Sequence, residues 1–309
     1  MFINLKLSHI SCFSNVKKVL YCILLSIDLV FASLTVAATE ESAIETNQAD
    51  YQERPLFELG LGIGGLYQPY YTGTKQSRTF AFPVPVPVYR GDFLKSDEDG
   101  VRAELLNSDR FKLEFSMDFN LAFDSDDVDL RTGMDDIDSR LQIGPSIEVK
   151  LAQTDHSQWL LNLPIRANIG ISGDGLNESG FTFAPNVTYF RNFDWSGTAW
   201  RAGVALGPQF GSKDYQNLYY GVDDAFATDT RPSYSADSGY AGSRLLMTLR
   251  SQNRERLWVW FVRYENISGA TFDDSPLVET NNGLSIGLIF SKFLFKSKQT
   301  VKRKVTPIQ

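Results

Sequence analysis

Hydrophobic and polar residues alternate along much of the chain after residue 56. In the clearest segment, residues 111–123, the odd-numbered positions hold Phe, Leu, Phe, Met, Phe, Leu and Phe, and the positions between them are mostly polar. A helix would scatter these seven residues around its surface, whereas a strand places all of them on one face. Thirteen residues exceed the ~5–6 of a usual globular strand and suit a tilted strand crossing an apolar layer of ~25–30 Å. The pattern therefore predicts a membrane-spanning strand.

Similar alternation elsewhere in the chain predicts ten strands in all. They are residues 57–67, 98–106, 111–123, 139–152, 158–170, 180–190, 200–210, 239–250, 257–265 and 283–293. Every second connection is short and most of the others are long, which is typical of outer-membrane barrels with tight periplasmic turns and long outer loops. The sequence thus predicts an all-β fold, in which residues 56–295 form a transmembrane antiparallel up-and-down β-barrel of about 10 strands.

Residues 79–90 depart from this pattern because Pro83, Pro85 and Pro87 occupy every second position. Proline has no N–H to donate, so a strand with three such positions along one edge cannot pair on both sides. The segment is either an extended, polyproline-like part of a loop or a strand paired on one side only. If this segment and residues 218–222 each supplied a strand, the barrel would have 12 strands, at the cost of the regular alternation of connections.

The first 38 residues have the features of a secretory leader. Lys17 and Lys18 precede an apolar stretch, and small residues end it at Ala38, so we expect cleavage after Ala38 and export to the outer membrane. An uncleaved anchor helix or a lipid anchor at Cys22 is less consistent with the polar interruptions of the stretch and with the large residue before Cys22.

Polar segments flank the predicted barrel on both sides. Residues 39–55 are polar and acidic and are predicted to form a flexible N-terminal lead-in. Barrels of this kind usually end on an aromatic residue, but here a basic C-terminal tail, residues 296–309, follows the last strand. The tail is interpreted as a solvated periplasmic segment, or as a basic segment that touches anionic murein or lipid head groups.

Composition narrows the chemistry that the exported chain could carry out. The chain has 309 residues, 22% charged residues and a mean hydropathy of -0.20, which excludes a bundle of transmembrane helices. Its net charge of -7 argues against nucleic acid as a partner. Cleavage after Ala38 would leave no cysteine and only His156 as a histidine, which excludes disulfides and His- or Cys-based metal sites.

Two further motifs have simple structural explanations. Gly60, Gly62 and Gly65 match the dinucleotide-binding spacing G-x-G-x-x-G, but they lie inside an alternating strand with no helix after them. Glycines that face a narrow lumen or ease strand curvature are the favoured interpretation. His156 lies in a predicted turn between Asp155 and Ser157, and a lone histidine in a turn is more often solvated than catalytic, so no catalytic residue and no cofactor is predicted.

The predicted loop between residues 124 and 138 is strongly acidic. Asp124, Asp126, Asp127 and Asp129 form a weak candidate site for a divalent cation, because carboxylate oxygens are the ligands that Ca²⁺ and Mg²⁺ prefer. The loop lacks the glycine and the closing Glu of an EF-hand. A solvated run of charge is the favoured interpretation, and diffuse binding of ions that bridge lipopolysaccharide is the alternative.

The predicted inward positions are rich in charge of both signs. They are Glu114, Asp118, Glu148, Lys150, Arg166, Arg244, Arg250, Arg263 and Glu265. Such residues can pair across a narrow interior, and a barrel of ten strands lies well below the size of open porins. We therefore expect a filled lumen and not a freely conducting one.

Several segments of the sequence resemble the MipA/OmpV family of outer-membrane proteins. The matching segments are residues 69–73, 83–93, 133–138 with 144–145, 219–222, 231–234 with 239–240, and 274–278. The resemblance implies an outer-membrane barrel without catalysis and, for the family's founding member, a scaffold that links a murein hydrolase to a murein synthase. Outer-membrane lipid and lipopolysaccharide would be further partners. A small-solute channel is the alternative, and an outer-membrane enzyme dependent on His156 ranks last.

Overall fold

The computed structural model describes residues 51–90, 94–97, 100–172, 175–253 and 255–304. The predicted leader and most of the predicted lead-in lie outside these residues. Within the described ranges, no helix is long and apolar enough to cross a membrane.

Strands make up most of the chain. In order they are β1 (Tyr51–Pro55), β2 (Phe57–Pro69), β3 (Ser77–Arg90), β4 (Leu94–Asp97), β5 (Gly100–Asn107), β6 (Phe111–Asn120), β7 (Ser139–Gln153), β8 (Ser157–Ser172), β9 (Gly175–Phe183), β10 (Asn186–Trp195), β11 (Thr198–Gly211), β12 (Gly239–Gln252), β13 (Arg256–Asn266), β14 (Asn282–Lys296) and β15 (Thr300–Lys304). In the described ranges, the loops contain one α-helix, α2 (Lys213–Tyr220), and three 3₁₀ turns, η1 (Ser125–Asp127), η2 (Asp129–Arg131) and η3 (Asp224–Phe226).

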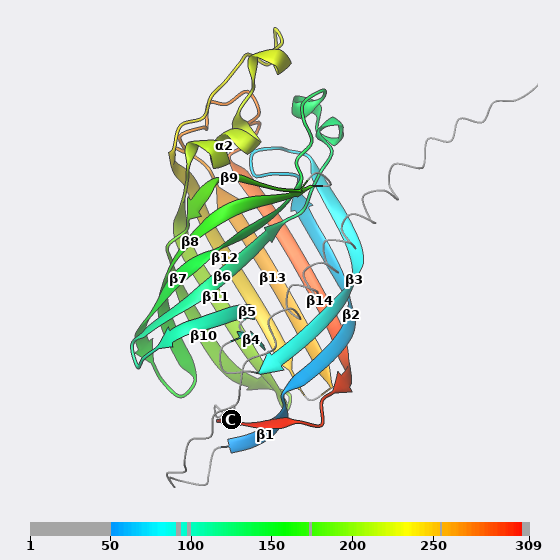
Figure 1. Ribbon diagram of the computed structural model, residues 1–309, viewed down its shortest axis with the longest axis vertical. Helices are drawn as coiled ribbons and strands as arrows, with labels where there is room; N and C mark the ends of the chain where they lie inside the picture. The colour runs from blue at the N-terminus through cyan, green and yellow to red at the C-terminus, as the bar shows by residue number, and fades with distance from the viewer. Residues whose placement is uncertain (1–50, 91–93, 98–99, 173–174, 254, 305–309) are drawn as a thin grey trace, which may run out of the picture.

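Antiparallel pairing closes these strands into a barrel (Figure 1). The sheet runs from β10 through β14 to β2 and on to β9, and β8 pairs with β10 to complete the circuit. β9 and β10 pair with β8 in one continuous register, so they form a single long strand interrupted at residues 184 and 185. The predicted barrel is confirmed.

The strand count differs from ten because the prediction missed two strands in residues 68–97. All ten predicted strands are present, and β3 and β4 add two more. The prolines are in β3, which pairs with β2 along its whole length but with β4 only at Tyr89 and Arg90. Of the two alternatives predicted for this segment, the structure therefore has the strand that is paired mainly on one side. The alternative strand at residues 218–222 is wrong, because this stretch completes α2 and then leaves it.

The apolar stripes face outward, as a lipid-facing wall requires. Four of the five odd-numbered residues of β6 are exposed, with Phe111 at 58% and Met117 at 41%, while Lys112 on the other face is buried. On β2, Leu61 and Ile63 are exposed at 54% and 69%. Apolar side chains that would cause the protein to aggregate in water therefore lie where a membrane would cover them.

The two ends of the barrel differ in structure (Figure 1). Turns at one end are short, and this end also carries β1, which pairs with β15 from Tyr51↔Lys304 to Pro55↔Thr300. Arg90 lies at this end of the barrel, where it donates to the Pro55 carbonyl at 2.8 Å and pairs with Glu58 at 2.6 Å. The long loops gather at the opposite end. Because outer-membrane barrels have short turns on the periplasmic side and long loops outside, the β1–β15 end is periplasmic.

Two of the three β2 glycines that match the dinucleotide-binding spacing face the lumen, as expected, and the third does not. Gly60 and Gly62 lie on the inward face, whereas Gly65 pairs with the outward residues Ala81 and Leu288. A Cβ at Gly62 would lie 2.1 Å from the Phe290 carbonyl oxygen, so the close approach of β2 and β14 requires glycine there. A Cβ at Gly65 would meet nothing nearer than 3.9 Å.

This contrast predicts that Gly62→Ala destabilises the barrel while Gly65→Ala does not. Forcing β2 from β14 should cost about 1–3 kcal/mol, as overpacking does elsewhere. Urea unfolding of the refolded barrel, followed by the mobility shift between folded and heated samples on gels, measures the difference. Equal midpoints for the two variants would contradict the close strand approach.

Candidate functional site

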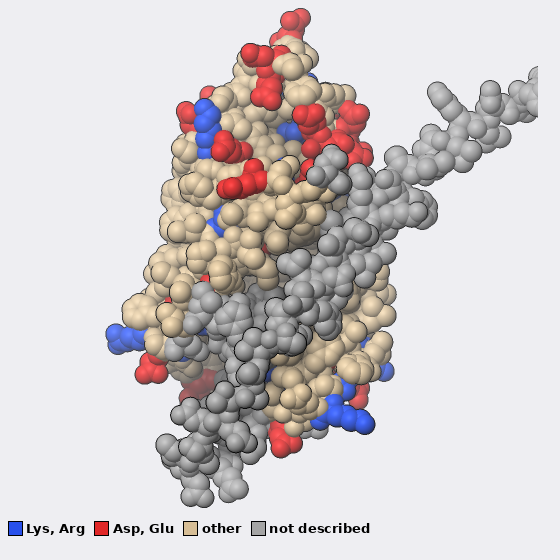
Figure 2. All heavy atoms as spheres, in the orientation of Figure 1, with Lys and Arg blue, Asp and Glu red and all other residues tan. Residues whose placement is uncertain are grey.

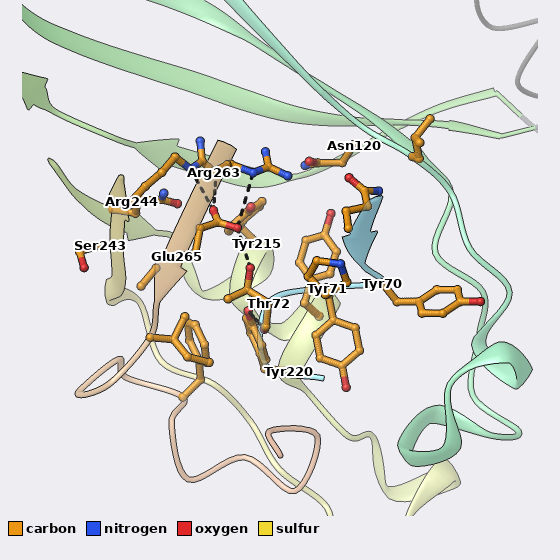
Figure 3. A pocket seen from close by; sticks show the side chains of 18 of the residues that line it. Tyr70, Tyr71, Thr72, Asn120, Tyr215, Tyr220, Ser243, Arg244, Arg263 and Glu265 are labelled. Atoms are coloured by element: carbon orange, nitrogen blue, oxygen red, sulfur yellow. Dashed lines mark hydrogen bonds and ion pairs between the residues drawn. The ribbon is translucent and has the colours of Figure 1, made fainter. Parts of the chain in front are cut away.

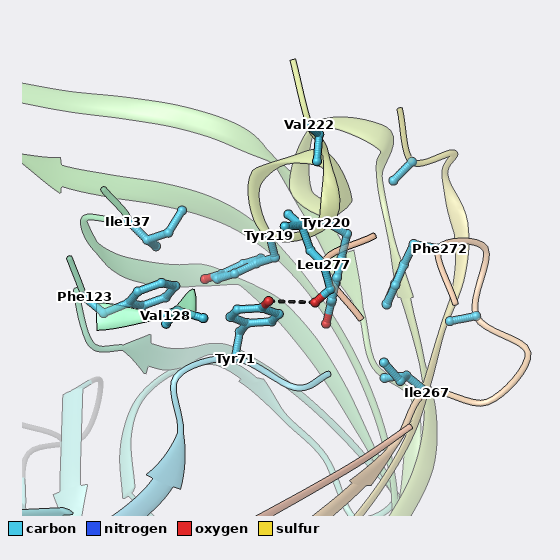
Figure 4. Close-up of a cluster of buried hydrophobic side chains, with 12 residues drawn as sticks. Tyr71, Phe123, Val128, Ile137, Tyr219, Tyr220, Val222, Ile267, Phe272 and Leu277 are labelled. Atoms are coloured by element: carbon cyan, nitrogen blue, oxygen red, sulfur yellow. Dashed lines mark hydrogen bonds between the residues drawn. The ribbon is translucent and has the colours of Figure 1, made fainter. Parts of the chain in front are cut away.

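Four loops at the outer end fold together into a lid over the barrel mouth. The lid consists of residues 70–76, 121–138, 212–238 and 267–281. It contains the main buried apolar cluster of the described chain (Figure 4), made of Tyr71, Phe123, Val128, Ile137, Tyr219, Tyr220, Val222, Ala236, Ile267, Ala270, Phe272 and Leu277. The core of this protein therefore lies in its loops.

Helix α2 is the part of the lid that crosses the barrel mouth, and hydrogen bonds fix its start and its middle. Ser212 caps the helix, since its hydroxyl accepts from the Tyr215 N–H at 3.4 Å and from the Phe181 N–H at 3.0 Å. Gln216 is fully buried and donates to the carbonyls of Gly211 and Gly239, at 3.2 and 3.1 Å. These bonds set α2 across the mouth near β9 (Figure 1).

Aromatic contacts join the first lid loop to the other loops. Tyr220 stacks on Phe272 with ring centroids 3.6 Å apart and planes 10° apart, and Tyr71 meets Tyr220 edge-on at 6.0 Å. The two phenols also make long-range bonds. Tyr71 donates to the Leu277 carbonyl and Tyr220 donates to the Thr72 carbonyl, each at 2.7 Å. Each tyrosine thus supplies buried area and satisfies a loop carbonyl.

Two arginines connect the acidic loop to the loop that carries α2. Arg131 is 2% exposed and donates to the Tyr219 carbonyl at 3.1 Å and to the Ser125 hydroxyl at 3.2 Å. Arg231 donates to the carbonyls of Leu130, at 2.8 Å, and Phe226. A guanidinium with several donors can satisfy many loop carbonyls at once, so these contacts substitute for regular secondary structure.

A charged cluster lies in the lumen directly beneath the lid (Figure 3). Arg244 pairs with Glu265 at 2.8 Å and with Asp118 at 3.5 Å, and Arg263 lies 3.8 Å from Glu265. Thr72 of the lid donates to Glu265 Oε2 at 2.8 Å, whereas Arg244 contacts Oε1. A cavity of about 100 Å³ separates this cluster from the lid tyrosines.

The predicted pairing of lumen charges is confirmed for several of the predicted residues. Asp118, Arg244, Arg263 and Glu265 form the cluster, and Arg166 donates to Ser116 at 2.9 Å. Glu114 pairs with Lys112 at 2.7 Å, and Lys112 was not among the predicted inward residues.

Part of the lumen wall is apolar, a feature that was not predicted from the sequence. β3 directs Phe80, Phe82, Val84 and Val86 inward, while its prolines face outward with the exposed side chains. Further along the wall, Val86 and Val88 pack with Leu257, Val259 and Phe293. The sequence did contain a signal for this apolar surface. The prolines of β3 occupy every second position, so the Phe and Val residues between them must share the opposite face of the strand.

The candidate cation loop does not gather its carboxylates around one point. Among the described residues, no three acidic, His or Cys side chains are placed to share a metal ion. Asp126 accepts from the Gly133 N–H at 2.9 Å, and Asp136 accepts from the Ser125 N–H at 2.7 Å. Burial, reinforced by Asp124, raises the pKa of Asp127. Acidic side chains gather at this end of the molecule (Figure 2), and diffuse ion binding there stays a prediction.

His156 is exposed in the β7–β8 turn, far from the lid.

Barrel closure, outward apolar stripes, short turns at one end and a loop lid at the other define an outer-membrane β-barrel. The sequence matches the family described as "MltA-interacting protein MipA" over residues 61–292. Because this match spans most of the chain, the protein belongs to the MipA family, as its resemblance to the family predicted. The matching segments quoted above meet mainly in the lid, which includes Tyr71, Tyr220, Arg231 and Leu277.

Two solved structures show a distant likeness to this chain. A "Bacterial polysaccharide outer membrane secretin" is 6% identical, covers 77% of this chain and 99% of its own, and has a TM-score of 0.37. A "Crystal structure of a Pseudomonas aeruginosa FadL homologue" is 10% identical, covers 70% and 61%, and has a TM-score of 0.29. A search of curated sequences gave no match.

The buried tyrosines predict that the lid is sensitive to alkali. Burial raises the pKa of Tyr71, Tyr219 and Tyr220 above the ordinary value of 10.0. Below that value these phenols are neutral in both the closed and the opened lid, so they do not oppose closure. As pH rises through it, the opened lid gains phenolate and the closed lid does not, so closure weakens.

Phenolate absorbance and limited proteolysis of the lid loops, followed together against pH, test this. The buried phenols should ionise last, as the loops become cleavable. Tyr71→Phe removes one such phenol and should shift the opening to higher pH, while costing about 1 kcal/mol at neutral pH through its lost hydrogen bond. Titration of all tyrosines in a single step, with intact loops, would contradict the prediction.

Proposed function

We propose that this protein is a non-enzymatic outer-membrane scaffold that holds murein-hydrolysing and murein-synthesising enzymes near the membrane. The family to which the chain belongs is described by its interaction with MltA, and the resemblance noted above implies both partners. The observation that supports this function over transport is the lid, whose four loops share one buried core across the outer mouth.

The periplasmic end is the face that such partners would meet. There β1 and β15 form a two-stranded sheet outside the barrel wall, with Lys302, Arg303 and Lys304 paired to Glu53, Gln52 and Tyr51. Basic residues at this level would face murein, whose peptides carry carboxylates. Export with cleavage after Ala38, and contact of the acidic loop with lipopolysaccharide through divalent cations, belong to the same proposal.

A pull-down from solubilised envelopes tests the scaffold. The intact protein should recover a murein hydrolase and a murein synthase, and deletion from Ser297 onward should reduce recovery. Lys302→Gln combined with Arg303→Gln and Lys304→Gln is the matched control, since it removes charge but leaves the chain in place. Loss in both variants assigns the contact to charge, and loss in the deletion alone assigns it to β15. Recovery of neither enzyme by the intact protein would refute the scaffold.

A small-solute channel is the second candidate, favoured by the cavity between the lid and the charged cluster. The lid tyrosines and the Arg244–Glu265 pair cross the route along the barrel axis. Purified protein in planar bilayers should therefore show no steady conductance at neutral pH. A lid-loop deletion of residues 223–234 is the control, because it should raise the conductance if the lid is the barrier. Steady ohmic steps from the intact protein would reject the filled lumen and favour the channel.

A further inference from the structure

Among the described residues, no strand pairing joins the upper parts of β3 and β6 across the barrel wall. β4 and β5 separate these two strands near the periplasmic end, where β5 pairs with β6 from Asn107↔Lys112 to Ala103↔Phe115. Above that level, β6 pairs only with β7, and residues 77–86 of β3 pair only with β2. Two strand edges thus face each other across the wall without a shared ladder in the described part of the chain.

The backbone of β3 is adapted to such an edge. In an antiparallel ladder, alternate residues direct their N–H and C=O groups to opposite edges, and proline fits only where its nitrogen faces away from the partner. Pro83 and Pro85 pair with Ile63 and Leu61 of β2, so their nitrogens face the edge toward β6. Both positions lack the N–H that would otherwise face an apolar medium without a partner, at considerable cost.

β6 shows a complementary adaptation on its own edge. The Phe111 carbonyl accepts from Ser108 in the β5–β6 turn, so the odd-numbered residues of β6 direct their polar backbone groups toward β5 and the gap above it. Phe119 is one of these residues, and its N–H donates to the side chain of its neighbour Asp118, at 2.9 Å. A side chain thus takes the place of the missing strand.

The unpaired region is bounded above as well as below. Arg78, near the start of β3, donates to the carbonyls of Ala122 and Leu121 just beyond β6, at 2.7 and 3.1 Å. The guanidinium lies over the Phe80 ring at 4.8 Å. We call the region between this arginine and the β4–β5 pair the window.

On the β3 side, the interior of the window is lined by apolar side chains that lean away from the gap, whereas the β6 side carries Ser116 and Asp118. Phe82 and Val84 face inward, and a Cβ on Gly64 of β2 would lie 3.1 Å from the Phe82 ring and 2.7 Å from a Val84 methyl. These side chains therefore lie over β2, where glycine leaves room for them. Barrel interiors are usually polar, so an apolar surface here is an unexpected feature.

The outer rim of the window belongs to the lipid-facing surface. Met117 and Phe119 on β6 are each 41% exposed, and Ile63 of β2, on the far side of β3 from the window, is 69% exposed. An apolar interior surface, an apolar rim and two edges with adapted backbone groups favour one kind of occupant, which is a hydrocarbon chain from the surrounding bilayer. We propose that the window admits the acyl chain of a membrane phospholipid, which binds against Phe80, Phe82 and Val84.

Tryptophan quenching by brominated lipid tests this inference, which is independent of the scaffold role. In a background with all five tryptophans changed to Phe, Phe82→Trp places a reporter inside the window. The protein is reconstituted in phosphatidylcholine vesicles with or without bromine on the acyl chains. Contact with an acyl chain should quench this reporter nearly as strongly as a tryptophan at the lipid-facing position Ile63→Trp.

Two further variants make the result decisive. Phe190→Trp is the matched interior control, because Phe190 lies on the inward face of β10, where Arg201 covers its ring at 4.2 Å. It should stay unquenched. Val84→Trp is a second window reporter if Phe82→Trp does not fold, as judged by gel mobility. Quenching at position 82 or 84 no greater than at position 190 would overturn the proposal, and strong quenching at all three would show that lipid enters the lumen without using the window.

Discussion

The structure depends on burying loop aromatics in the lid. A membrane barrel of this size turns its apolar stripes to lipid, so its wall provides little dry interior of its own. Tyr71, Tyr220 and Phe272 make that interior at the outer end, where three loops far apart in sequence meet. Each fully buried large apolar side chain contributes about 1.5–3 kcal/mol, which can offset the entropy of ordering long loops.

The lid also determines the state of the lumen beneath it. Thr72 belongs to the first lid loop, and its hydroxyl donates to Glu265, which is already held by Arg244. Lid closure and the arrangement of the charged cluster are thus connected through one carboxylate. A buried ion pair adds little stability by itself, but breaking it leaves an uncompensated charge. The cluster therefore favours one arrangement of the lid over its alternatives.

The outward face of the barrel was predictable from the sequence, whereas the lid was not. Two-residue alternation identifies β6 without a structure, because lipid on one side and water or polar groups on the other impose period two. β3 was ambiguous because both of its faces are apolar, proline outside and Phe or Val inside. Residues 218–222 look like a strand in isolation, but the Ser212 cap and the buried Gln216 place this stretch at the end of a helix. Contacts between loops, such as that of Arg131 with Tyr219, leave no periodic signal in the sequence.

A closed mouth and an interrupted wall are related consequences of the same fold. The β4–β5 pair is short, so the strands on either side of it cannot share a ladder above it, and Arg78 must bridge them beneath the lid. That arginine lies over Phe123, a member of the lid core, as well as over Phe80 at the window. Loss of lid packing would therefore loosen the upper boundary of the window. Arg78 thus connects the lid core to the upper boundary of the window, so a change in lid packing would also reach the wall of the barrel.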